Sequence, residues 1–287
     1  MKVIPVNPRG YCPGVIRAIR ILENVLADPA YPRPVHLLGM IVHNAFVVDD
    51  FRRKGVIVHD DPGKTRLELL EDIREGTVVV TAHGAGDDVF RKIREKGLSC
   101  VDATCRDVYR TRDLIKERLA SGDSVLYIGK AGHPETEGVL SLSPKIRLVE
   151  RPEDVASLPA LEGSVFVTNQ TTFSLKEIGP VLDAVTARFP RARVAEEICS
   201  STRLRQEALL AALPGADACV VVGDPRSNNT ANLALLAQGA GYPAFRVASA
   251  ADLRQEWFSG MQILVVTSGA STPPAVTAEV LRVLESW

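Results

Sequence analysis

Three short stretches of this 287-residue chain repeat one local plan, and this repeat constrains the fold more than any other feature. In each stretch, an apolar run typical of a strand leads to a cysteine and then to a run with helical periodicity. The cysteines are Cys12, Cys105 and Cys199, separated by 93 and 94 residues (105 − 12 and 199 − 105). The near-equal spacing predicts three similar units, each delivering one thiolate from a turn between a strand and a helix.

The position of these cysteines indicates a metal-binding role. A thiol at the first turn of a helix lies at the positive end of the helix dipole, which favours the thiolate. Three such thiolates, with no fourth cysteine at a matching place, fit an iron–sulfur cluster that keeps one iron open. The remaining two, Cys100 and Cys219, lie inside apolar runs, and we expect both in the hydrophobic core.

Composition excludes several classes of protein. The length allows two or three domains or one large α/β domain. The net charge of −1 argues against binding to nucleic acid or to an anionic membrane surface. No apolar run reaches the roughly 18 residues of a membrane span. The sequence opens directly on a predicted strand, so we expect no signal peptide. We therefore expect a cytoplasmic protein whose cysteines stay reduced.

Strands and helices alternate along the whole chain, and this order is typical of parallel sheets covered by helices. The strands are predicted at 2–6, 35–38, 77–81, 99–101, 124–128, 164–168, 192–195, 218–222 and 262–267. The helices are predicted at 15–26, 45–54, 87–96, 107–120, 175–189, 202–213 and 274–285, with one more ending at 238. We infer three small, pseudo-threefold-related α/β domains around a central cavity, at 13–104, 105–198 and 199–281, with 1–12 and 282–287 as terminal segments.

Polar loops follow the second and third strand of each predicted unit, where α/β folds bind ligands. These loops carry His43, His133 and Ser227 with Asn229 after the second strands, and His83, Thr171 and Ser271 after the third. Loops that open helices offer backbone N–H groups and hydroxyls to phosphate oxygens. We therefore expect a site for an anion such as a diphosphate.

One carboxyl group stands out beside this anion site. Glu135 follows His133 across a proline, and the two form a candidate pair for proton delivery. A carboxylic acid is a suitable general acid when its surroundings raise its pKa toward neutrality. The plainer alternative is that Glu135 only stabilises a helix N-terminus. His36 and His59 belong to no motif, and we expect them in loops or at the surface.

Several of these residues fall in motifs that resemble a known enzyme family. The opening stretch Pro8-Arg9-Gly10-Tyr11-Cys12-x-Gly14-Val15-x-Arg17-Ala18 is similar to the signature of 4-hydroxy-3-methylbut-2-enyl diphosphate reductases, which end the non-mevalonate isoprenoid pathway. Eight further motifs resemble the family's in the same order, between about residues 5 and 280: 41–44, 82–84, 102–105, 132–135, 170–172, 198–206, 227–229 and 269–271.

The resemblance implies a specific chemistry. It implies a trefoil of three α/β domains around a [4Fe–4S] cluster bound by Cys12, Cys105 and Cys199. It implies that Glu135 delivers protons, with His133 and Thr171 near the substrate hydroxyl. It implies reductive loss of that hydroxyl, giving isopentenyl and dimethylallyl diphosphate, with reduced ferredoxin or flavodoxin as the electron donor. The implied substrate-binding residues are His43, His83, His133, Thr171, Ser227, Asn228, Asn229 and Ser271.

The chain also departs from the family pattern. Pro13 replaces a small residue after the first cysteine, Arg106 replaces a proline after the second, and Asn228 replaces a serine. Ala231 and Asn232 differ just beyond it. These changes leave open a related iron–sulfur reductase that acts on another diphosphate.

Two other function classes also remain open. One is a zinc enzyme using the same Cys and His residues, although zinc ligands usually occur at closer, paired spacings. The other is a phosphate-ligand sensor, which needs the anion loops but neither the cysteines nor Glu135.

Overall fold

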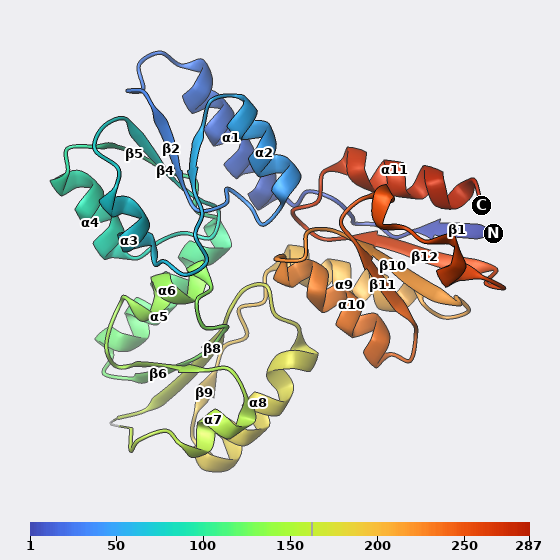
Figure 1. Cartoon of the computed structure of the whole chain (residues 1–287). Coiled ribbons are helices and arrows are strands. Elements are labelled where there is room, and N and C mark those ends of the chain that lie inside the picture. Colours follow the sequence, from blue (N-terminus) through green and yellow to red (C-terminus); the bar gives the residue numbers. More distant parts are fainter. Residues whose placement is uncertain (162) are drawn as a thin grey trace. The chain divides into compact units, whose positions relative to one another are not determined.

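The protein is described by a computed structural model that covers residues 1–161 and 163–287. In these residues the strands form three sheets of four strands each, and every pair of neighbouring strands is parallel (Figure 1). This confirms the predicted α/β class with parallel sheets. The chain divides into two compact units: unit 1 comprises Met1–Ile16, His43–Val47 and Cys199–Trp287, and unit 2 comprises Arg17–Val42 and Val48–Ile198.

Unit 2 contains two of the sheets. The first has the order β3-β2-β4-β5 and the second has the order β7-β6-β8-β9. The strands are β2 (Val35–Leu38), β3 (Ile57–His59), β4 (Thr77–Val80), β5 (Ser99–Asp102), β6 (Ser124–Ile128), β7 (Ile146–Val149), β8 (Val165–Asn169) and β9 (Arg193–Val194). The helices of residues 13–198 are α1 (Pro13–Ala27), α2 (Ala45–Arg53), α3 (Arg66–Glu71), α4 (Asp87–Glu95), α5 (Arg106–Ala120), α6 (Pro134–Leu140), α7 (Pro152–Ala156) and α8 (Leu175–Arg188). The first residues of α1 and α2 belong to unit 1.

Unit 1 contains the third sheet, with the order β1-β12-β10-β11. Its strands are β1 (Lys2–Pro5), β10 (Ala218–Val222), β11 (Ala244–Val247) and β12 (Ile263–Ser268). The first strand of the chain therefore completes the sheet built by the last segment. Its helices are α9 (Ser200–Ala212), α10 (Asn228–Gly239) and α11 (Pro274–Glu285), with two 3₁₀ helices, η1 (Ala250–Asp252) and η2 (Gln255–Phe258).

The three sheets share one strand order. When the unit 1 sheet is read from β11, the orders β3-β2-β4-β5, β7-β6-β8-β9 and β11-β10-β12-β1 correspond position by position. The last strand of each order is an edge strand, and each is followed by one of the three cysteines and a helix. The repeat predicted from the cysteine spacing is therefore present in the topology, whereas the exact domain boundaries at 104 and 198 stay a prediction.

Burial on both faces explains the continuous apolar strands. In β10, Val220 and Val222 pack with α11 and η2, whereas Cys219 and Val221 pack with α9 and α10. Successive side chains of a strand point to opposite faces, so a strand covered on both sides needs apolar residues at every position. Cys219 is fully buried, as predicted.

Two expectations from the sequence are wrong. Cys100 is exposed, because it lies on β5, an edge strand that pairs only with β4. His36 is buried on the inner strand β2, where its Nδ1 lies 2.9 Å from Nε2 of His59 on β3.

The short elements β3, α3, α6, β7, α7 and β11 were not predicted, because three to seven residues carry too little periodicity. Among the described residues, no helix is both long and apolar enough to cross a membrane.

Candidate active site

The predicted polar loops lie at the carboxyl ends of the inner strands. His43, His133 and Ser227 each come five residues after the end of β2, β6 and β10. His83, Thr171 and Ser271 come two or three residues after the end of β4, β8 and β12. In a parallel sheet the carboxyl ends of the strands lie on the same side, so the loops after β6 and β8 come together, as do the loops after β10 and β12.

Glu135 lies at the centre of the polar contacts in the second sheet of unit 2. It belongs to the first turn of α6 and is 2% exposed. Its Oε1 accepts hydrogen bonds from the Thr171 backbone N–H at 2.9 Å and from the Tyr127 hydroxyl at 3.2 Å. Its Oε2 accepts from the Thr171 hydroxyl at 2.9 Å. The carboxyl group is therefore fixed by three donors in a buried site.

Burial makes Glu135 hold its proton more tightly. Loss of hydration raises the pKa of Glu135 to about 7, although the hydrogen bonds from Thr171 and Tyr127 oppose the rise. Burial and the nearby carboxylate also raise the pKa of Tyr127 well above its ordinary value, so its hydroxyl stays protonated. Glu135 can therefore give up or take a proton near neutral pH.

Two of the histidines of unit 2, His83 and His133, lie beside each other near this acid. The rings of His83 and His133 are 5.5 Å apart and nearly perpendicular. His133 is the N-cap residue of α6, and its Nδ1 accepts from the Glu135 backbone N–H at 3.2 Å. Within the pair predicted for proton delivery, His133 therefore contacts the backbone of Glu135, while Thr171 and Tyr127 contact the carboxyl group.

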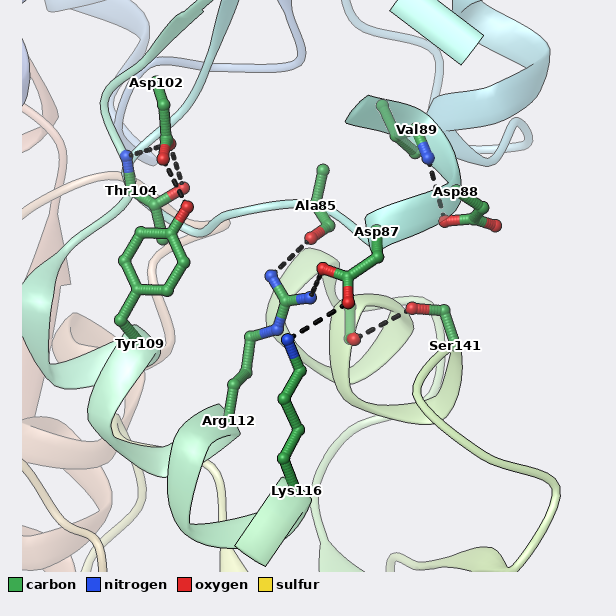
Figure 2. A network of polar contacts seen from close by, with 11 residues as sticks. Ala85, Asp87, Asp88, Val89, Asp102, Thr104, Tyr109, Arg112, Lys116 and Ser141 are labelled. Atoms are coloured by element: carbon green, nitrogen blue, oxygen red, sulfur yellow. Dashed lines mark hydrogen bonds and ion pairs between the residues drawn. The ribbon is translucent and has the colours of Figure 1, made fainter. Parts of the chain in front are cut away.

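Cys105 is the N-cap residue of α5, and a polar network fixes the turn before it (Figure 2). The carboxylate of Asp102 accepts from the backbone N–H and hydroxyl of Thr104 and from the Tyr109 hydroxyl. The carbonyl of Thr104 accepts from Arg17 at 2.8 Å. The backbone that presents the thiol is thus held from both sides of the turn.

In unit 1, the thiols of Cys12 and Cys199 also lie at helix starts. The sulfur of Cys12 accepts from the backbone N–H of Val15 at 3.4 Å. The sulfur of Cys199, the N-cap residue of α9, accepts from the Thr202 N–H at 3.4 Å and lies 3.1 Å from the Thr202 hydroxyl oxygen. Such contacts stabilise a thiolate.

Arg205 joins these two cysteine turns. It is 3% exposed and donates to the carbonyls of Gly10 at 2.7 Å and Ser201 at 2.8 Å. Burial lowers the pKa of Arg205, and the charges of Cys12 and Cys199 oppose this change. In the sequence, Arg205 lies within the motif at 198–206, and the motif gives it no function. Its contacts with the two cysteine turns were therefore not predicted. An arginine on the buried face of α9, six residues after Cys199, was the available signal.

The anion-loop residues of unit 1 differ in their partners. Ser227 is the N-cap residue of α10, with its oxygen accepting from the Thr230 N–H at 3.3 Å. Asn229 uses both ends of its amide, because Oδ1 accepts from the Ala270 N–H at 2.9 Å and Nδ2 donates to the Thr202 hydroxyl at 3.3 Å. By contrast, the buried Nδ2 of Asn228 has no hydrogen-bond partner among the described residues. Asn228 is therefore the better placed of the two asparagines to donate to a ligand.

The His43 loop is fixed within unit 1 by two side chains. The Ser271 hydroxyl donates to the His43 carbonyl at 2.9 Å. The carboxylate of Asp224 accepts from the Ala45 backbone N–H at 2.8 Å. Asp224 was also missed from the sequence, because nothing in its local pattern links it to a loop 179 residues away.

Unit 1 thus carries Cys12, Cys199, His43, Ser227, Asn228, Asn229 and Ser271, whereas unit 2 carries Cys105, His83, His133, Glu135 and Thr171.

Two residues that depart from the family pattern lie at helix starts. Pro13 occupies the first position of α1, where proline is favourable. Arg106 occupies the first position of α5 and is exposed.

The sequence profile of the LytB protein family matches residues 3–285. The chain belongs to the LytB protein family. It is 47% identical over 289 residues to 4-hydroxy-3-methylbut-2-enyl diphosphate reductase of Geobacillus sp. (strain WCH70), covering 100% of this chain and 91% of that protein. It is 46% identical to the enzyme of the same name from Brevibacillus brevis (strain 47 / JCM 6285 / NBRC 100599), covering 100% and 92%.

Solved structures of LytB-type reductases have the same fold. The E-1-hydroxy-2-methyl-but-2-enyl-4-diphosphate reductase from Plasmodium falciparum matches with a TM-score of 0.91 and 27% identity, over 99% of this chain and 87% of that one. A second structure, of (E)-4-hydroxy-3-methyl-but-2-enyl diphosphate reductase, matches with a TM-score of 0.69 and 28% identity over the full length of both chains. The predicted family, its oxidoreductase class and its fold are therefore confirmed.

Proposed function

We propose that this LytB protein reduces 4-hydroxy-3-methylbut-2-enyl diphosphate to isopentenyl and dimethylallyl diphosphate. The reaction takes up two electrons and two protons and releases the hydroxyl group as water. Membership of the family supports this activity, because relatives that match over the whole chain carry the reductase name. The observation that carries the proposal within this chain is the buried Glu135, with three hydrogen-bond donors and a pKa of about 7.

The cysteines fit an iron–sulfur cluster as its protein ligands. None of Cys12, Cys105 and Cys199 forms a disulfide, and each directly precedes a helix that follows an edge strand. Thiolates are the usual ligands of such clusters, and three of them leave one iron open. When bound, a [4Fe–4S] cluster supplies the electrons and an iron for the substrate hydroxyl. Arg205 supplies a buried positive charge beside Cys12 and Cys199, which favours an anionic group there.

The remaining residues bind and protonate the substrate. Ser227, Asn228, Asn229 and Ser271, together with His43 and His83, are the proposed diphosphate ligands. In its protonated form Glu135 is the proton donor, with Thr171 and Tyr127 fixing the direction of its carboxyl group. Tyr127 also keeps its own proton, so it donates to the carboxylate after transfer. His133 is proposed beside the substrate hydroxyl, since it is the N-cap residue of the helix that carries Glu135 in its first turn.

The test is turnover by anaerobically purified protein whose iron and acid-labile sulfide have been counted. A reduced viologen dye is the electron source in place of the proposed ferredoxin or flavodoxin, and hydroxymethylbutenyl diphosphate is the oxidant. We expect dye oxidation that depends on the substrate. A full cluster without turnover indicates a reductase for another diphosphate, and zinc without sulfide indicates a hydrolase-type metal site.

A matched pair of cysteine variants tests the ligand assignment. Cys105→Ser is expected to lose the cluster and the turnover together. Cys100→Ser changes an exposed thiol on β5, only a few residues away, and is expected to keep both. Turnover that survives in Cys105→Ser would contradict the assignment of Cys105 as a cluster ligand.

A further inference from the structure

A buried arginine in unit 2 contacts the loop that carries His83. Arg112 lies on α5, seven residues after Cys105, and is 2% exposed. Its Nη1 donates to the backbone carbonyl of Ala85 at 2.7 Å, and its Nη2 donates to Oδ1 of Asp87 at 2.6 Å (Figure 2). Ala85 comes two residues after His83, and Asp87 is the first residue of α4.

The other side of the same loop packs on α6, the helix that begins at His133. A Cβ atom added to Gly138 of α6 would lie 3.4 Å from the carbonyl carbon and oxygen of Ala85. A Cβ atom added to Gly86 would lie only 2.5 Å from the hydroxyl oxygen of Ser141 at the end of α6. The loop therefore has little space to move toward α6, and Arg112 holds it from α5.

The turn at Gly84 restricts the loop further. Gly84 adopts φ +78°, a conformation that side chains with a Cβ atom rarely adopt. A Cβ atom added there would lie 3.0 Å from the Thr104 methyl group, directly before Cys105. The backbone on the C-terminal side of His83 is thus fixed against the helix that starts at Cys105 and against the helix that starts at His133.

We propose that Arg112 is a positioning residue, which sets the place of His83 by anchoring the Ala85 carbonyl between α5 and α6. Packing alone does not explain a buried guanidinium, because an apolar side chain of similar volume stabilises a buried site as well or better. The directional bonds of Arg112 instead give the loop one defined position. The role rests on the proposed function, since His83 is proposed as a diphosphate ligand.

Lys116 provides a matched control on the same helix. Its Nζ lies 3.1 Å from Oδ2 of Asp87, which belongs to α4 and not to the loop that carries His83. Burial alone would raise the pKa of Asp87, but the hydrogen bond from Lys116 and the charge of Arg112 outweigh it and lower this pKa. Lys116 thus shares the ion pair of Arg112 without sharing its contact with Ala85.

The experiment compares Arg112→Met, Arg112→Lys and Lys116→Met with the unmodified protein, each anaerobic and loaded with its cluster. Three quantities are measured: the Kd of inorganic diphosphate by calorimetry, kcat and KM for the reductase reaction, and hydrogen exchange of the 82–86 amides. Loss of a charged hydrogen bond predicts a Kd and KM raised about tenfold in Arg112→Met, with faster exchange at 82–86. Arg112→Lys is expected to recover part of the affinity, and Lys116→Met is expected to bind normally.

The outcomes separate this proposal from the proposed function. If Arg112→Met unfolds at lower temperature but keeps the normal Kd and the normal exchange at 82–86, Arg112 is merely structural and the proposal is wrong. If the unmodified protein neither turns over nor binds diphosphate, the proposed function fails. The exchange at 82–86 then still decides whether Arg112 fixes the loop.

Discussion

The second sheet of unit 2 and the sheet of unit 1 place a buried polar side chain at the same position, but the two side chains differ in chemistry. In both, the loop after the second strand supplies an N-cap residue, His133 or Ser227, and a buried side chain two residues later. In unit 2 that side chain is Glu135, which accepts from the Thr171 N–H at 2.9 Å. In unit 1 it is Asn229, which accepts from the Ala270 N–H at 2.9 Å.

The difference lies in the charge of the two buried groups. Glu135 can ionise, and burial raises its pKa to about 7. The amide of Asn229 cannot ionise, and it uses its N–H₂ group to contact Thr202 beside the Cys199 thiol. The same scaffold thus places an ionisable carboxyl group in one sheet and a neutral amide in the other. One side chain, rather than the fold, decides which of the two sheets carries a group that can exchange a proton.

The largest expected effect comes from replacing the carboxyl group of Glu135 by a neutral amide, as in Asn229. Glu135→Gln keeps the shape but removes the transferable proton, so kcat is expected to fall about 100-fold or more. Binding of inorganic diphosphate is expected to persist. Glu137→Gln is the control, because Glu137 lies on the same helix and its pKa is also raised by burial. Loss of diphosphate binding together with turnover would contradict a proton-donor role.

The second prediction concerns the pH dependence of folding. The pKa of Glu135 is about 7 in the folded protein against an ordinary 4.5, so ionisation costs more in the folded state. Below pH 4.5, where Glu135 is protonated in both states, the folded protein keeps its full stability. As the pH rises through 7, ionisation of Glu135 lowers the free energy of unfolding by about 3 kcal/mol. Denaturant unfolding of the unmodified protein and Glu135→Gln across this range measures it. Equal pH slopes for the two proteins would contradict the raised pKa.

The reverse exchange tests the neutral site. Asn229→Asp puts a carboxylate where the side chain is 5% exposed and removes the donor to Thr202. The free energy of unfolding is expected to fall by about 2 kcal/mol at pH 8, and by less at pH 4, where the new carboxyl group is protonated. Asn232→Asp is the comparison on the same helix, because Asn232 is also 5% exposed. Equal losses in the two variants would mean that the Thr202 contact is unimportant.

The smallest expected effects come from removing the hydroxyl groups of Thr171, in the loop after β8, and Ser271, in the loop after β12. Thr171→Val removes the donor to Oε2 of Glu135, so the pKa of Glu135 rises further and the alkaline limb of the kcat profile moves up. Ser271→Ala removes a bond to the His43 carbonyl and is expected to raise KM a few-fold without moving this limb. If the alkaline limb of the kcat profile moves in Ser271→Ala, or does not move in Thr171→Val, the two sheets do not differ in acid chemistry as predicted.

Much of the candidate site follows from the sequence because its residues are fixed by local rules. A cysteine directly before a helix, or a polar residue just past a strand, is placed by the order of elements alone. Tyr127 was missed, although a tyrosine within an aliphatic buried strand already implies a partner for its hydroxyl. Arg112 was missed in the same way, since it lies on the apolar face of α5 with Val108 and Ile115.

The sequence by itself determined the threefold order of strand, cysteine and helix, the α/β class and the polar loops, because periodicity and turn chemistry act over a few residues. Only the tertiary structure decided that β1 completes the last sheet, and that Thr171 fixes Glu135 from 36 residues away. It also decided that Arg112 holds Ala85 and that Arg205 reaches Gly10 across 195 residues. These contacts depend on how whole elements pack, and the buried charges take their pKa values and partners from that packing.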